Sequence, residues 1–137
     1  MIVYHMYQHL NQGIFRYRGL DRQFHKRLKG YQGYVNDHHI IPQSLQNHSL
    51  IKLINYDINS NDNLFIMPKY AALHKFNMHP STMVHEGNHL KYNAFVKHNL
   101  DVINNYQTQE EQCYYLWLFI CYLKKNLTFN NDEIPWN

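Results

Sequence analysis

Two histidines in the second half of the chain, His85 and His89, have the spacing that first points to chemistry. If a helix begins near Ser81, which is a suitable N-cap, their side chains lie one turn apart on one helix face. Two imidazoles so placed can ligate one divalent metal ion, with positions left for a third ligand, water and an anion. Among 11 histidines, about one such spacing arises by chance, so two solvent-exposed helix residues are the simpler interpretation of the pair alone.

Gly87 lies between these two histidines and bears on their geometry. Glycine inside a helix costs about 1 kcal/mol relative to alanine, so it usually has a local reason. Close approach of a phosphate or of a strand would supply one. The alternative is a helix that begins only after Gly87, which would separate the paired ligands.

A second histidine feature, His38 and His39, lies near the end of a strand predicted over residues 34–41. Pro42 stops that strand because proline has no amide hydrogen for a continuing ladder. His38 is the best third metal ligand. Adjacent residues of a regular strand point to opposite faces, so both rings can enter one site only if the strand bends or ends there.

The elements that would position these residues predict an α+β fold. Residues 64–67 form a second short strand, stopped by Pro68, which can pair with the first as a hairpin. Residues 49–56 give one or two helical turns, and residues 57–63 are a loop. The helix from Ser81 runs on through Tyr92 and Val96, and a last helix covers residues 108–126. Its predicted apolar stripe consists of Tyr115, Leu118, Phe119, Tyr122 and Leu123.

Composition limits the class of protein. A chain of 137 residues is expected to be one domain, residues 1–137, with a basic N-terminal segment (1–33), a core (34–98) and a helical C-terminal segment (99–137). Its 45% apolar and 17% charged residues exclude the signature of disorder.

Cys113 and Cys121, expected in a buried helix, indicate neither a disulfide framework nor a thiolate metal site. No signal peptide or membrane span is predicted, which favours a cytoplasmic or host-cell intracellular protein.

Basic charge is concentrated toward the N-terminus. Six basic residues and one acid lie between positions 16 and 29, whereas residues 101–137 carry two lysines and five acids. This asymmetry predicts that the N-terminal part faces phosphate, and a solvated surface is an equally good alternative. The candidate substrate-binding residues are Arg16, Arg18, Arg22 and Lys26.

Three motifs together resemble the AHH family of nucleases, a branch of the HNH and endonuclease VII superfamily built on a ββα-metal core. Residues 37–42 (DHHIIP) are similar to its Ala-His-His, two aliphatic residues and proline. Residues 63–68 (NLFIMP) are similar to its asparagine-led strand, and residues 85–92 (HEGNHLKY) to its histidine, glycine, histidine and tyrosine helix. The resemblance covers residues 34–98, with Asp37 where alanine is usual and Leu64 where glycine is frequent.

The resemblance implies a metal-dependent endonuclease that hydrolyses phosphodiester bonds, in DNA in preference to RNA. His38, His85 and His89 would hold one divalent ion, Mg²⁺, Mn²⁺ or Zn²⁺. His39 would take a proton from the attacking water, and Asn63 would orient the ring of His39. Tyr92, one turn beyond His89, is a secondary candidate for contacting phosphate, although an aromatic residue there is more often core. Members are commonly toxin domains with an immunity protein as partner; the sequence leaves the oligomeric state open.

Two other classes of protein fit part of the sequence. A module of the same fold could bind metal or nucleic acid without cleaving it, in which case His39→Ala would change little. A zinc metalloprotease would use His85-Glu86-x-x-His89, which matches the zincin pattern literally. That pattern explains neither the His-His-aliphatic-aliphatic-Pro run nor the asparagine-led strand, so the nuclease interpretation ranks above it.

Overall fold

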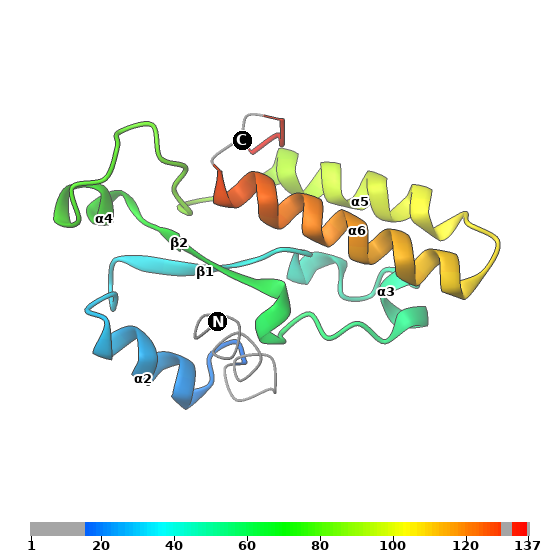
Figure 1. Ribbon diagram of the computed structural model, residues 1–137, viewed down its shortest axis with the longest axis horizontal. Coiled ribbons are helices and arrows are strands. Elements are labelled where there is room, and N and C mark those ends of the chain that lie inside the picture. The colour runs from blue at the N-terminus through cyan, green and yellow to red at the C-terminus, as the bar shows by residue number, and fades with distance from the viewer. Residues whose placement is uncertain (1–15, 130–132, 137) are drawn as a thin grey trace, which may run out of the picture. The chain divides into compact units, whose positions relative to one another are not determined.

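The computed structural model describes residues 16–129 and 133–136 and confirms the α+β class (Figure 1). In chain order the elements are α2 (Leu20–Leu28), β1 (Val35–His39), α3 (Ser49–Ile54), β2 (Leu64–Pro68), α4 (Tyr70–Lys75), α5 (Leu90–Asn104) and α6 (Gln109–Thr128), with 3₁₀ turns at Gln43–Leu45 and Asn61–Asn63. Two compact units are present. The first holds the described residues up to His39 and Asn59–Glu86, and the second holds Ile40–Ile58 and those from Gly87 onward.

The first unit contains the predicted hairpin. β1 and β2 pair antiparallel in a regular register that runs from Val35 opposite Pro68 to His39 opposite Leu64 (Figure 1). Both strands are short, as the two prolines predict, and the connection between them is long. This two-stranded hairpin is compatible with a ββα-metal core.

The register decides how the two adjacent histidines are presented. No bulge interrupts the pairing, so side chains alternate along β1 up to His39, where the strand ends, and the chain bends at Ile40 and Ile41. Asp37 and His39 therefore leave one face of the strand, and Asn36 and His38 leave the other. The sequence requires β1 to bend or to end at the two histidines if both rings are to enter one site. The strand does end there, and the rings of His38 and His39 leave it from opposite faces.

Helix α2 was not predicted, because its pattern is the reverse of an ordinary amphipathic helix. Arg22 and Lys26, one turn apart, are buried at 5% and 8% exposure. The apolar residues of the helix face outward instead: Leu20, Phe24 and Leu28 are 86%, 55% and 70% exposed. Rules that bury apolar residues and expose charges therefore fail on this segment.

The long helix begins later in the chain than the sequence predicts. The expected helix from Ser81 does not form, and α5 begins only at Leu90. The backbone N–H of His85 donates to the carbonyl of Pro68 at 2.9 Å, which holds this segment against the end of β2. Gly87 then adopts a φ of 72°, a left-handed conformation that no right-handed helix contains.

The reason for Gly87 is thus its backbone conformation. Close approach of a strand was another explanation that the sequence allowed, but a Cβ at this position would have no protein atom within 4 Å. The alternative interpretation, a helix that starts after the glycine, is the one that the structure bears out.

The second unit is a small helical core formed by α3, α5 and α6. These three helices contact one another, and α5 and α6 lie side by side in Figure 1. Fully buried aliphatic residues come from each part of the unit: Ile40, Ile41, Leu50, Val96, Leu100 and Leu123. The two predicted helical turns at 49–56 correspond to α3.

Helix α6 matches its predicted range, but its buried face is different. Thr108 caps it by accepting a hydrogen bond from the backbone N–H of Glu111. The buried aliphatic and aromatic residues are Leu116, Phe119, Ile120, Leu123 and Leu127, whereas three residues of the predicted stripe, Tyr115, Leu118 and Tyr122, are exposed.

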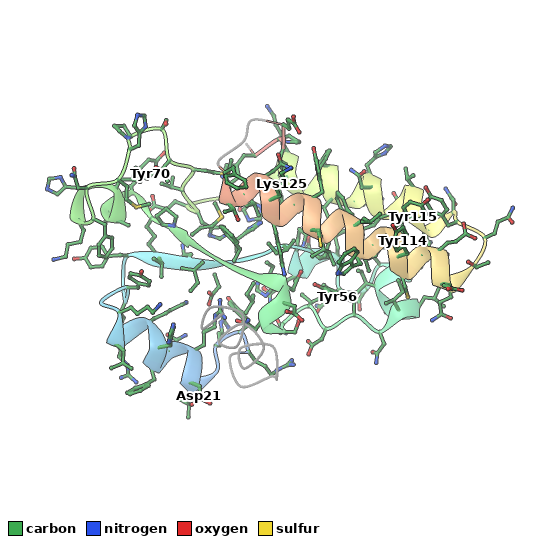
Figure 2. All side chains as sticks on the ribbon, viewed as in Figure 1. Asp21, Tyr56, Tyr70, Tyr114, Tyr115 and Lys125 are labelled. Atoms are coloured by element: carbon green, nitrogen blue, oxygen red, sulfur yellow. The ribbon has the colours of Figure 1, made fainter. Side chains whose placement is uncertain are left out.

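The two cysteines of α6 differ from the prediction as well. Cys113 and Cys121 were expected in a buried helix, but both are exposed free thiols. Tyr114 and Tyr115, which Figure 2 labels on this helix, are both exposed. In the described part of the chain no helix is long and apolar enough to cross a membrane.

Candidate active site

His38 and His85 are brought together in the first unit. His38 extends from β1 and is completely buried. Its ring centroid lies 5.2 Å from that of His85, and a nitrogen of one ring lies within 4.8 Å of a nitrogen of the other. Neutral imidazole nitrogens are good ligands for divalent metals such as Zn²⁺. The donor chemistry of the pair therefore fits a metal ion.

Both backbone groups of His85 are held by the hairpin. Its N–H donates to the carbonyl of Pro68 in β2, and its own carbonyl accepts a hydrogen bond from Nδ2 of Asn36 in β1 at 2.8 Å. Asn36 is on the same face of β1 as His38. Sequence reasoning missed Asn36, because a single asparagine next to a motif gives no signal until the strand register is known.

His89 belongs to the second unit, where it is the residue before α5. Its Nδ1 donates to Oδ1 of Asn93 at 3.0 Å, and its ring lies 4.9 Å from that of Trp136. A neutral imidazole that donates from Nδ1 carries its lone pair on Nε2. The predicted pairing of His85 and His89 on one helix face is wrong, since neither residue lies within a helix.

His39 leaves β1 on the face opposite to His38. It is 9% exposed, and its Nε2 lies 3.0 Å from Oδ1 of Asn59. The ring of Tyr17 contacts it edge-on, with centroids 4.5 Å apart. Burial lowers the pKa of His39 below its ordinary value of 6.5, and this outweighs the hydrogen bond to Asn59 and the charge of Asp37, which raise it. The ring is therefore neutral at neutral pH and can accept a proton.

Asn63 and Tyr92 are both completely buried. Asn63 ends the 3₁₀ turn that leads into β2. The hydroxyl of Tyr92 donates to the carbonyl of Ile40 at 2.6 Å, and burial raises its pKa, so the hydroxyl stays protonated. In this arrangement Tyr92 fixes the backbone that follows the two histidines, and its hydroxyl points away from solvent.

The chain matches the model of a known protein family. A family model matches residues 22–115, and its description is a nuclease family of the HNH/ENDO VII superfamily with conserved AHH. The chain belongs to the AHH family. No curated protein and no solved structure matches it. As an AHH nuclease it acts on nucleic acid, and the family match covers both strands and all four histidines at positions 38, 39, 85 and 89.

The alanine of the AHH motif is replaced here by Asp37, and the structure gives that aspartate a definite environment. Its Oδ1 accepts hydrogen bonds from Arg22 at 2.9 and 2.7 Å, and its Oδ2 accepts one from Lys26 at 2.7 Å. Arg22 also donates to Oδ1 of Asn61. Burial alone would raise the pKa of Asp37, but the hydrogen bonds from Arg22 and Lys26 outweigh it and hold the pKa below its ordinary value. The carboxylate is therefore charged, and it ties β1 to α2.

This network changes the role expected for the candidate substrate-binding residues of the AHH chain. The charges of Arg22 and Lys26 are directed into the fold at Asp37, so neither forms the open basic surface that the sequence suggested. Arg16 and Arg18 are exposed. Arg18 adopts a φ of 61° and lies 5.0 Å from the centre of the Tyr17 ring.

One pocket of the AHH chain takes its lining from both faces of β1. It has a volume of about 370 Å³ and runs along Val35, Asn36 and Asp37. Arg18 and Lys26 line it on the α2 side, and His85 lines it on the other. Among the described residues β1 pairs only with β2, so the other edge of β1 has no strand partner.

The metalloprotease interpretation loses its geometric basis in this structure. A zincin site needs both histidines and the glutamate on one helix, and residues 85–89 are not helical. The glutamate is also engaged elsewhere, because Oε1 of Glu86 accepts a hydrogen bond from the backbone N–H of Tyr70 at the start of α4. The label of Tyr70 in Figure 2 marks this position.

Proposed function

We propose that the chain is a metal-dependent endonuclease in which His39 is the general base and His38, His85 and His89 hold one divalent ion. The observation that carries this proposal is the close pair of His38 and His85 on one face of β1, with a neutral, buried His39 as the next residue. His89 follows His85 by only four residues in the chain. The histidine set therefore provides both a ligand group and a base.

The opposite orientations of His38 and His39 suit hydrolysis of a phosphodiester. In an in-line displacement the attacking water and the leaving oxygen lie on opposite sides of the phosphorus atom. A base on one face of a strand and ligands on the other can serve these two positions if the phosphate lies at the strand's end or edge. The pocket lined from both faces of β1 gives the neighbouring nucleotides a place to bind.

The proposed step is hydrolysis with balanced proton transfer. His39 removes one proton from water, the water oxygen forms a bond to phosphorus, and the bond from phosphorus to the 3′ oxygen breaks. The leaving oxygen takes up a proton from solvent, and His39 returns its proton to solvent. When bound, a divalent ion supplies positive charge to the phosphate and to the leaving oxygen. Asn63, buried at the start of β2, would keep the hairpin and its connection in place.

Cleavage of supercoiled plasmid and of RNA with added Mg²⁺, Mn²⁺ or Zn²⁺ tests this proposal. We expect the purified chain to nick and linearise the plasmid with a divalent ion, to cut RNA more slowly, and to stop when EDTA is in excess. Substitution of the exposed histidine His98→Ala is the matched control and should leave the rate unchanged. Cleavage that continues in EDTA, or no cleavage of either polymer with any of the three ions, would contradict the proposal.

A further inference from the structure

The connection between the two strands supplies a residue that the histidine motifs do not contain. Asn59 lies in the stretch that was predicted as a loop, and its Oδ1 is 3.0 Å from Nε2 of His39. Its backbone carbonyl also accepts a hydrogen bond from the N–H of Tyr17 at 3.0 Å. Tyr17 in turn places its ring against the ring of His39. Asn59, Tyr17 and His39 thus form a closed set of three contacts, all within the first unit.

The chemistry of the amide fixes which nitrogen of His39 carries the hydrogen. The carbonyl oxygen of an asparagine side chain is only an acceptor, so Nε2 must be the donor in this contact. A neutral imidazole has one hydrogen, and its lone pair is then on Nδ1. Nδ1 is consequently the atom that can take a proton from water.

From these contacts we infer that Asn59 is a positioning residue, which selects the Nε2–H tautomer of His39 and holds its ring so that Nδ1 acts as the base. The inference rests on the proposed role of His39 and adds to it the residue that orients the ring, a role that the family resemblance assigns to Asn63. Groups that orient a histidine in this way commonly change activity about 10- to 100-fold when removed. Tyr17 restricts the rotation of the ring that the hydrogen bond leaves open.

Two substitutions at one position test the direction of the hydrogen bond. Asn59→Leu has a similar size but no acceptor, and we expect kcat to fall about 10- to 100-fold with KM changed by less than about threefold. Asn59→Asp keeps only acceptor oxygens, and it should restore kcat to within about fivefold of the parent. If the amide instead donated to Nε2, Asn59→Asp would be as defective as Asn59→Leu, which would overturn the inference.

A spectroscopic measurement separates this inference from the proposed function. Long-range ¹⁵N–¹H correlation spectra above the pKa of the ring report which imidazole nitrogen is protonated. We expect Nε2–H at His39 in the parent and in Asn59→Asp, and a mixture of both tautomers in Asn59→Leu. An Nδ1–H ring in the parent, or an unchanged tautomer and kcat in Asn59→Leu, would refute the role of Asn59. If His39→Ala cuts as fast as the parent, the proposed function fails instead, and the tautomer result still reports on the contact.

Discussion

His39→Ala is expected to lower kcat by a factor of about 10² to 10⁴, the usual contribution of a positioned general base. The ring is neutral because its burial lowers the pKa, and it lies at the end of β1 next to a buried ligand candidate. Removing it takes away the proton acceptor while leaving His38 and His85 in place. The same variant should therefore bind a divalent ion as well as the parent does.

Single-turnover cleavage and metal titration of His39→Ala, measured side by side, check this expectation. The control is His98→Ala, which removes an exposed imidazole from α5 and should change neither quantity. Thermal unfolding of both variants shows whether any loss of rate follows from loss of structure. Parental kcat in a folded His39→Ala variant would exclude His39 as the base.

Asp37→Asn is expected to destabilise the chain by about 3–5 kcal/mol, the usual cost of breaking a buried ion pair. The side chain of Asp37 is 3% exposed and faces two cations that are themselves buried, Arg22 and Lys26. A neutral amide would leave both cations inside the fold without a compensating charge. Chemical denaturation of the parent and the variant at neutral pH measures the difference in free energy of unfolding.

The control for this variant is Asp101→Asn. Asp101 also contacts two partners, the ring of His48 and the cation of Lys97, but its side chain is 49% exposed, so solvent screens the interaction. We expect a much smaller loss of stability there. Equal losses in the two variants would mean that burial of the Asp37 network contributes nothing.

The pH dependence of stability follows from the same carboxylate. The pKa of Asp37 in the folded chain is held below its ordinary value of 3.8. A group with a depressed pKa contributes stability that is fully present above the ordinary value and is lost as the pH falls through the folded value. The gap between parent and Asp37→Asn should therefore narrow below about pH 4.

Much of the hairpin and of the last helix could be predicted from the sequence, because local rules decide them. Pro68 ends β2, β1 ends at His39 shortly before Pro42, and the alternation of side chains along β1 follows from the strand itself. Thr108, followed by acidic residues, marks the start of α6. The four motif histidines can be recognised in the sequence alone, since their spacing and the neighbouring prolines are local features of the chain.

The rest depends on contacts between residues far apart in the chain. Helix α2 buries Arg22 and Lys26 because Asp37 neutralises them, and no hydropathy pattern contains that information. Glu86 caps α4 from 16 residues away, and Asn59 reaches His39 across 20. The start of α5 depends on the backbone angle of Gly87, for which the sequence allowed two interpretations.

Binding of Mn²⁺ to the parent and to His38→Ala, His85→Ala and His89→Ala is the most direct test of the three-histidine metal site. Free Mn²⁺ can be followed by electron paramagnetic resonance, with His98→Ala as the matched control. The expected result is one ion per chain in the parent and in the control, and affinity reduced at least about tenfold in each of the three variants. If all three variants bind Mn²⁺ as tightly as the parent, these histidines do not form a metal site, and the proposed mechanism is wrong.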